Sequence, residues 1–206
     1  KGKEVFDPIH EFLEEVSNES VLQSRALWVL AQIGEKGEQV VEKFLEDDKN
    51  EKLQVVAYRA LRHADPTGTL ACAKEYADSK NLFLRREIAV SLRGIAFEDS
   101  RSILESLVDG YDGTNRFYLE ALGVAFHGNE KQIYNQIVSK RFPEPSMWNW
   151  KAKNLAWRLH TPEAIRDLDQ CIRAQKPPVD EFRFLAMAFA SFRTDEERKD
   201  RVDRLQ

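Results

Sequence analysis

Apolar positions along the chain repeat at an interval of 30 to 34 residues. The repeat is visible in helical stretches that align on one residue each, namely Leu30, Leu61, Leu92, Leu122, Ala156 and Phe189. Subtraction gives intervals of 31, 31, 30, 34 and 33 residues between successive anchors. An apolar residue also stands four positions before and three positions after every anchor, which is the spacing of one face of a helix. The pattern therefore predicts a helix at each anchor.

A second apolar pattern follows each of the first five anchors, with doublets at positions i, i+1, i+4 and i+5 and some irregularity in the last. The doublets are Val40-Val41-Phe44-Leu45, Cys72-Ala73-Tyr76-Ala77, Ile103-Leu104-Leu107-Val108, Ile133-Tyr134-Ile137-Val138 and Ala164-Ile165-Leu168-Ile172. Such spacing is typical of an amphipathic helix with a narrow buried stripe. Gly, Pro, Asp and Asn recur between these helices in phase with the apolar pattern, as residues that end and start helices do.

Paired helices that repeat at this length are typical of an α-solenoid, in which each pair packs on its neighbours. We therefore predict an all-α fold, an α-α superhelix of about six helix pairs preceded by one N-terminal helix. The whole chain, 1–206, is predicted to form a single repeat domain. Its parts are a capping helix over 1–20 and repeats over approximately 21–50, 51–81, 82–111, 112–144, 145–177 and 178–206.

The helix pairs resemble HEAT repeats, in the short form also found in phycobilin-lyase-like bacterial proteins, over nearly the whole chain. The resemblance implies that the first helix of each pair lines the convex side of the solenoid and the second helix the concave side. Polar residues between the buried doublets of the second helices are then the candidates for a binding groove. They are Glu42, Glu46, Lys74, Glu75, Asp78, Glu105, Gln136, Lys140, Arg166 and Arg173.

The candidate groove grades from acidic in the first three repeats to neutral or basic in the later ones. Two interpretations stay open, a solvated polar face and a charge-graded groove that binds a protein. The net charge of -4 and the pI of about 5.7 argue against a protein whose main task is to grip a polyanion. No segment reaches the ~20 apolar residues of a membrane helix, and we expect no membrane insertion and a monomer.

No catalytic or cofactor motif is found in the sequence. Cys72 and Cys171 match no disulfide framework, zinc motif or haem motif, and both are expected in the core. His63, His127 and His160 each stand where a first helix ends, about 10 Å apart from repeat to repeat. That separation is too large for two imidazoles to share a zinc ion. We expect no metal and no cofactor in this chain, and no enzymatic activity.

The stretch Asp109 to Gly123, DGYDGTNRFYLEALG, is interpreted as a turn, a cap and a first helix. Asp112 or Thr114 is expected to accept hydrogen bonds from the free N–H groups of the first helical turn. Arg116 is not needed for capping and is kept as a candidate binding residue.

Two tryptophans stand in an irregular segment rich in proline and aromatic residues, FPEPSMWNW. Trp148 and Trp150 either fill the space left by the longer repeat interval or anchor a ligand.

The stretches YDGTNRFYLEALG and AWRLHTPEA are also similar to the HEAT region of large multidomain proteins from planctomycetes and related bacteria, often called haem-binding or membrane-bound dehydrogenase-like. That resemblance implies a periplasmic or extracellular location, with a cytoplasmic one left open, and a parent protein with a β-propeller and a cytochrome c domain. This sequence has no Cys-x-x-Cys-His motif, so neither haem binding nor dehydrogenase activity is transferred to any residue.

The function expected from the sequence is a non-catalytic scaffold, a fragment of a larger exported redox protein that binds a protein partner or other domains of its parent chain. The alternatives are a HEAT-like DNA glycosylase or nucleic-acid-binding protein, and a lyase or chaperone for a tetrapyrrole. The acidic groove argues against the first alternative, and we expect no nucleic acid among the partners.

Overall fold

The computed structural model describes residues 2–47 and 49–176, and every regular element in these two ranges is a helix. The fold is therefore all-α, as the sequence predicts. The predicted sixth repeat, 178–206, lies outside the described residues together with its anchor Phe189. None of the described helices combines the length and the apolar character that crossing a membrane requires.

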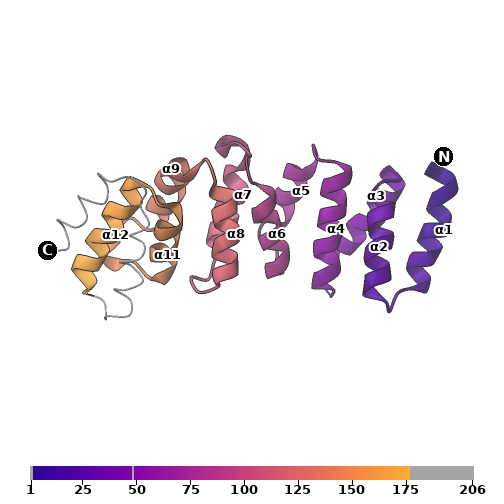
Figure 1. The fold of residues 1–206 in the computed structure, drawn as a ribbon, viewed down its shortest axis with the longest axis horizontal. Helices are drawn as coiled ribbons and strands as arrows, with labels where there is room; N and C mark the ends of the chain where they lie inside the picture. The colour runs from indigo at the N-terminus through magenta and orange to yellow at the C-terminus, as the bar shows by residue number, and fades with distance from the viewer. Residues whose placement is uncertain (1, 48, 177–206) are drawn as a thin grey trace. The chain divides into compact units, whose positions relative to one another are not determined.

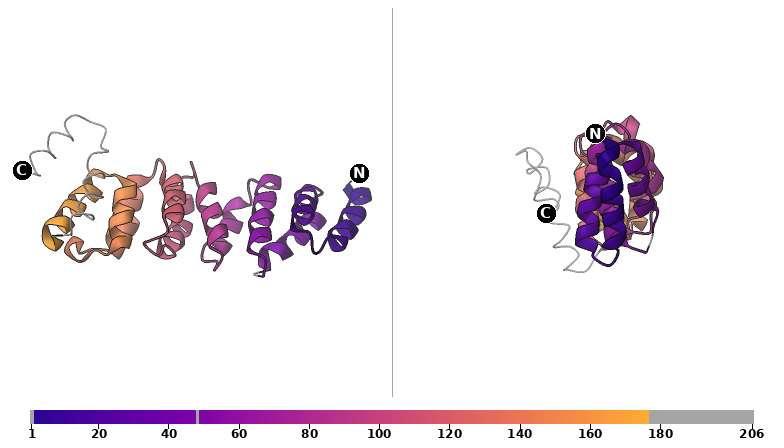
Figure 2. Two further views of the ribbon diagram at one scale, coloured as in Figure 1. Left: turned by 60° about the horizontal axis from the view of Figure 1, so that its bottom comes forward. Right: turned by 90° about the vertical axis from the view of Figure 1, so that its right-hand side faces the viewer.

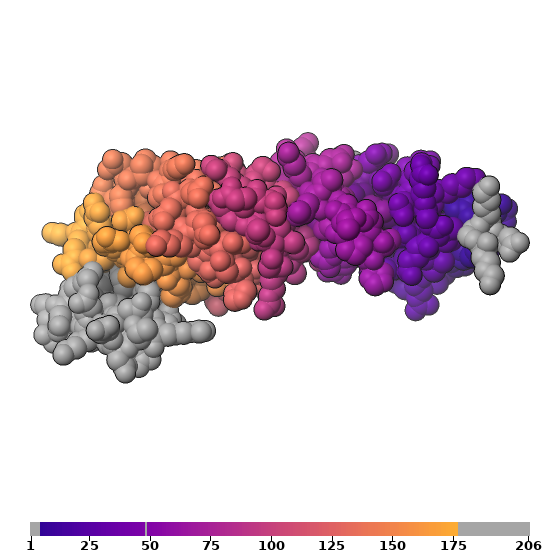
Figure 3. All heavy atoms as spheres, turned by 90° about the horizontal axis from the view of Figure 1, so that it is seen from above, coloured from indigo at the N-terminus to yellow at the C-terminus, as the bar shows by residue number. Residues whose placement is uncertain are grey.

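The chain divides into two compact units, Lys1–Ser91 and Leu92–Gln206. The boundary falls between the two helices of the predicted repeat 82–111. Each unit has its own buried core, and side chains fill the space between neighbouring helices within each unit (Figure 3).

Unit 1 consists of helices joined by short turns (Figure 1). They are α1 (Gly2–Glu15), α2 (Ser20–Leu30), α3 (Glu35–Glu46), α4 (Glu51–Ala64), α5 (Thr69–Tyr76) and α6 (Leu82–Ser91). Within the unit α1 contacts α2, α2 contacts α4 and α4 contacts α6, while α3 packs mainly on α4 (Figure 2). The second helices α3 and α5 thus connect a row of first helices, α2, α4 and α6.

Unit 2 continues the alternation of helices and short turns. Its elements are α7 (Phe97–Asp109), α8 (Arg116–Phe126), α9 (Glu130–Ile133), η1 (Tyr134–Val138), α10 (Ser139–Arg141), η2 (Pro145–Met147), α11 (Trp150–Leu159) and α12 (Pro162–Gln175). The elements α9, η1 and α10 follow one another without a break, and η1 is a π-helical turn within this stretch. The short 3-10 turn η2 contacts α12.

The apolar doublets of the second helices are buried, as predicted, in α3, α7, α9 with η1, and α12. Their buried members are Val40, Val41, Leu45, Ile103, Leu104, Leu107, Val108, Ile133, Tyr134, Ile137, Val138, Ala164, Ile165 and Leu168. Helix α5 differs, because Ala73 and Ala77 are buried while Cys72 and Tyr76 are only half-buried. Cys72, Ala73 and Ala77 are smaller than the residues at the same positions of α3, of α7 and of α9 with η1, while Tyr76 is large.

Asparagine caps four of the first helices at the same position. Its side-chain Oδ1 accepts a hydrogen bond from the backbone N–H three residues later, the usual way to satisfy a free donor of the first helical turn. The N···O distances are 3.1 Å at Asn50, 3.2 Å at Asn81, 2.9 Å at Asn115 and 3.1 Å at Asn149. The recurring asparagine therefore marks the start of each first helix from α4 to α11.

Candidate functional site

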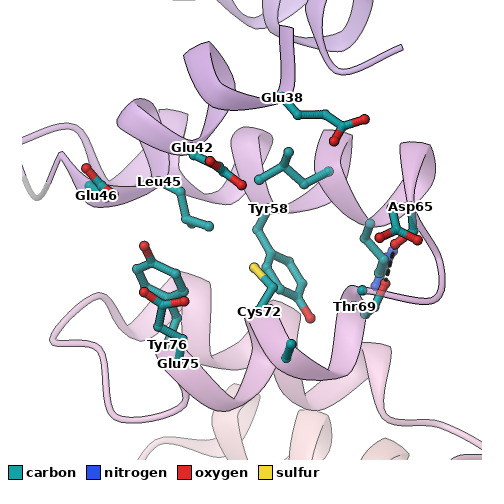
Figure 4. Close-up of a pocket in the computed structure, with 14 residues that line it drawn as sticks. Glu38, Glu42, Leu45, Glu46, Tyr58, Asp65, Thr69, Cys72, Glu75 and Tyr76 are labelled. Atoms are coloured by element: carbon teal, nitrogen blue, oxygen red, sulfur yellow. Dashed lines mark hydrogen bonds between the residues drawn. The ribbon is translucent and has the colours of Figure 1, made fainter. Parts of the chain in front are cut away.

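A surface cleft of about 370 Å³ opens between α3, α4 and α5 in unit 1. Its floor is apolar and aromatic and includes Leu45, Tyr58, Leu61, Cys72 and Tyr76. Figure 4 shows Tyr76 pointing from α5 toward α3, with Tyr58 and the sulfur of Cys72 in the middle of the cleft.

The cleft exists because α5 is a short helix with small side chains. Cys72 and Ala73 occupy the doublet positions that Ile103 and Leu104 occupy in α7. Of this pair only Cys72 lines the cleft, since Ala73 is fully buried. A larger side chain at position 72 would fill part of the space beside α3.

Carboxylates surround this floor. Five acidic residues line the cleft, Glu38, Glu42, Glu46, Asp65 and Glu75, together with the guanidinium group of Arg62.

Asp65 is committed to the turn after α4. Its Oδ1 accepts a hydrogen bond from the backbone N–H of Thr67 at 2.9 Å and another from the Thr67 hydroxyl. These hydrogen bonds lower the pKa of Asp65. Arg62 is directed to Glu87 of α6, with its Nη2 3.5 Å from the carboxylate. The remaining four glutamates form no ion pair within the described part of the chain.

Glutamates of both α3 and α5 raise the pKa values of Tyr76 and Cys72. Burial raises the pKa of Tyr76 to about 12, and the charges of Glu75, Glu46 and Glu42 add to the shift. Burial likewise raises the pKa of the Cys72 thiol to about 11, with further contributions from Glu75 and Glu42. Carboxylates from two helices therefore converge on one negative region above the floor.

Nothing in the cleft is activated for covalent chemistry. With a pKa of about 11 the Cys72 thiol stays protonated at neutral pH, and the thiol is a far weaker nucleophile than the thiolate. The Tyr58 hydroxyl shares a hydrogen bond of 2.7 Å with Ser91 Oγ, and burial raises its pKa to about 12. Among residues 2–47 and 49–176, no three His, Cys, Asp or Glu side chains are grouped so that they could hold a metal ion.

The structure brings together three of the predicted groove residues, Glu42, Glu46 and Glu75. Lys74 and Asp78 belong to the same predicted repeat as Glu75, but they are exposed and do not line the cleft.

In unit 2 the acidic groove candidate, Glu105, forms an ion pair with an arginine. Glu105 accepts a hydrogen bond from Arg101 Nε at 3.0 Å on the same helix. Nearby Asp109 binds Arg141 through both carboxylate oxygens, and this ion pair lowers the pKa of Asp109. The charges of Glu105 and Asp109 on α7 are therefore compensated by arginines.

The other groove candidates, Gln136, Lys140, Arg166 and Arg173, lie in unit 2. Gln136 is half-buried in the π-helical turn, while Lys140 and Arg166 are exposed. Arg173 is exposed and donates from Nε to Asp169 at 3.0 Å, one helical turn earlier on α12. Whether these residues and the glutamates of unit 1 belong to one groove stays a prediction from the sequence.

The two candidate tryptophans differ in exposure. Trp148 is 3% exposed, and its indole Nε1 donates to the backbone oxygen of Phe142 at 3.0 Å. Gln175 of α12 donates to the Trp148 backbone oxygen at 2.8 Å, which ties the irregular segment to the last described helix. These contacts favour the packing interpretation for Trp148. Trp150 is 43% exposed, with Lys153 Nζ 5.3 Å from its ring centre.

The loop DGYDGTN is held by contacts with α11, and one detail of its prediction is wrong. The cap of α8 is Asn115 instead of Asp112 or Thr114. The Asp112 carboxylate accepts from the backbone N–H groups of Thr114 and Asn115, at 2.7 and 2.8 Å, and so stabilises the turn before the helix. Asn154 of α11 donates to the Gly113 oxygen at 2.8 Å.

Arg116 follows this cap on the surface. Its side chain is 82% exposed, and its Nε lies 3.8 Å from Glu120 Oε1. An exposed pair at this distance stabilises a helix only weakly.

The floor of the cleft is not among the sites predicted from the sequence. Tyr58, Cys72 and Tyr76 were assigned to the core or left unassigned, and Glu38 was not a candidate. The signal that could have found them is the drop in side-chain volume at the α5 doublets. Comparisons of the chain with protein-family models, with curated proteins and with solved structures find no match.

Proposed function

We propose that the chain is a non-catalytic docking module, a HEAT-like α-solenoid whose second helices form the concave side and bind a protein. The paired helices, the asparagine caps at matching positions and the buried doublets support this architecture. The cleft between α3, α4 and α5 is the observation that carries the docking function, since it combines an apolar floor with unpaired carboxylates. An apolar centre within a polar rim is the usual composition of a protein-binding surface.

Nucleic acid is a poorer match for this surface. Binding to nucleic acid draws its affinity from Lys and Arg contacts with phosphates, and a rim of glutamates repels them. A tetrapyrrole is also disfavoured, since its propionate groups are anionic like the rim. At about 370 Å³ the cleft lies near the lower end of the ~300–1,000 Å³ of ligand pockets, which suits one or two protein side chains.

A photo-crosslinking experiment tests the docking function. The photoreactive amino acid p-benzoylphenylalanine replaces Tyr76, and the chain is irradiated in an extract of its source cells. We expect a protein to be captured, and we expect its capture to be lost when Glu42→Arg and Glu75→Arg are added. The matched control carries Glu11→Arg and Glu14→Arg on α1, which change the net charge equally at exposed positions away from the cleft. Equal capture by all three chains would refute docking at the cleft.

A titration with duplex DNA at low salt tests the competing function. The proposal requires weak binding or none. Tight binding that falls steeply as salt is added would replace it with a nucleic-acid function. The parent context remains part of the proposal, namely an exported redox protein in which this array links or positions other domains.

A further inference from the structure

We propose that the cleft between α3, α4 and α5 receives an arginine side chain from an extended segment of the partner protein. This inference rests on the docking function proposed above and specifies the chemistry of its occupant. The cleft is an open volume of about 370 Å³ with the small residue Cys72 in its lining. The charges then decide which side chain fills it.

The occupant must be cationic. Glu42, Glu46 and Glu75 line the cleft from two helices, and no basic group of the described chain pairs with them. Arg62, the basic residue of the lining, forms an ion pair with Glu87 instead, and Glu87 also binds Arg59. A cation from outside therefore compensates charges that the described part of the chain leaves open.

The floor distinguishes a side chain from a bare ion. A guanidinium group carries an apolar stem that covers apolar surface, and its planar face stacks on aromatic rings. The half-buried side chains of Leu61 and Tyr76 supply such a surface in the lining of the cleft. A divalent cation gains nothing from this floor and needs several oxygen ligands at one point. Figure 4 shows the glutamates distributed along the cleft, with Glu46 and Glu38 at opposite ends.

Arginine suits the cleft better than lysine. Its guanidinium group is more weakly hydrated and presents several donors in one plane, so that it can bind more than one carboxylate at once. Glu42 on α3 and Glu75 on α5 lie on opposite sides of the cleft, with Glu75 beside Tyr76 (Figure 4). A planar group between the two helices presents N–H donors toward both sides at once.

The test uses the peptide Gly-Ala-Arg-Ala-Arg-Ala-Gly and a twin with citrulline in place of both arginines. Citrulline keeps the shape of arginine but has no charge. Binding to the purified chain is followed by backbone amide chemical shifts in NMR. We expect the arginine peptide to shift amides of α3 and α5, and the citrulline peptide to bind at least about tenfold more weakly. That factor is the effect of losing two or three partly exposed ion pairs.

Two variants separate charge from shape. In Glu42→Gln with Glu75→Gln the cleft keeps its form and loses two charges. In Cys72→Ile the cleft is filled by the residue type that α7 carries at Ile103, and all charges remain. We expect both variants to bind the arginine peptide about tenfold more weakly. The control Glu11→Gln with Glu14→Gln is expected to bind like the original chain. If Cys72→Ile does not fold, Ala71→Leu, at an exposed position of the lining, takes its place.

Several outcomes would overturn the inference. If the citrulline peptide binds as tightly as the arginine peptide, a positive charge is not required for binding. Undiminished binding by the filled variant, with loss only in the charge variant, indicates general attraction to an acidic surface instead of insertion. Calcium chloride producing the same amide shifts as the peptide indicates an ion site.

The inference and the docking function fail separately. A crosslinked partner whose contact segment contains no arginine overturns the inference and leaves the docking function standing. Specific binding of the arginine peptide without any protein capture supports an arginine site in the cleft and leaves the docking function without support.

Discussion

Replacement of Asn81 by alanine is expected to destabilise unit 1 more than loss of a helix cap alone. Asn81 is 4% exposed, and its Oδ1 accepts from the N–H groups of Phe83 at 2.9 Å and Leu84 at 3.2 Å. Its Nδ2 donates to the backbone oxygen of Glu51 at 2.8 Å and to Gln54 Oε1 at 2.7 Å. One side chain thus caps α6 and joins it to α4.

The magnitude follows from counting the groups left without partners. Loss of an asparagine cap costs about 1 kcal/mol of unfolding free energy. Leaving the buried Gln54 Oε1 without its donor adds about 1–3 kcal/mol, giving roughly 2–4 kcal/mol for Asn81→Ala. Asn50 is the matched control, because it caps α4 through the same bond at 3.1 Å but is only half-buried, and no second partner of its side chain is described. Asn50→Ala should cost about 1 kcal/mol.

Urea unfolding of both variants, followed by far-UV circular dichroism, measures the difference. Amide hydrogen exchange then shows which helices lose protection in each variant. Gln54 also donates from Nε2 to the Leu45 oxygen at 3.0 Å, so Asn81→Ala should increase exchange at the end of α3 as well as at the start of α6. The reasoning is refuted if the two alanine variants lose the same stability, since the bonds to α4 would then contribute nothing measurable.

Three further predictions concern single positions. The alkylation rate of Cys72 by iodoacetamide should rise with pH only toward about 11, and Glu75→Gln should shift the rise to lower pH by removing a charge that raises the Cys72 pKa. The pKa of Cys72 is raised in the folded state, so the protonated thiol contributes stability that is fully present below pH 9.0, its ordinary pKa, and is lost as the pH rises through about 11. Cys72→Ala should therefore lose less melting temperature than the original chain between these pH values. Gly113→Ala should cost more unfolding free energy in urea than Gly128→Ala, because both glycines have positive φ, +88° and +86°, but only at Gly113 would the new Cβ lie 3.0 Å from the backbone of α11. Arg116→Ala should change the urea midpoint little, since its ion pair is exposed, and a loss above about 1 kcal/mol would contradict this assignment.

The helices could be predicted from the sequence because their signals are local. Doublets such as Ile103-Leu104 show which face of a helix is buried before any neighbour is known, and they are buried in the structure. The cap of α8 was misassigned because DGYDGTN offers several residues that can cap a helix. Which one does so depends on where the backbone becomes helical, and Asn115 is the last extended residue, with φ -71° and ψ 102°.

The cleft could not be predicted from periodicity alone. An apolar pattern treats Cys72 as equivalent to a larger residue such as Ile103, although its smaller volume leaves it in the lining of an open cleft. The ion pairs were missed for a different reason. Asp109 and Arg141 are separated by 32 positions in the sequence, and only packing of α7 against the end of the next helix pair makes them partners.

Pairing also changes what the predicted charge gradient means. Counting residues places acidic character in α7 as well as in α3 and α5, yet a carboxylate attracts a ligand only to the extent that its charge is not already compensated. Glu105 has Arg101 beside it, and Asp109 has Arg141, so an incoming cation would have to displace a guanidinium group there. At Glu42 and Glu75 no such displacement is needed within the described chain. The proposal therefore places affinity for a basic partner at the cleft of unit 1, where uncompensated carboxylates line an open volume.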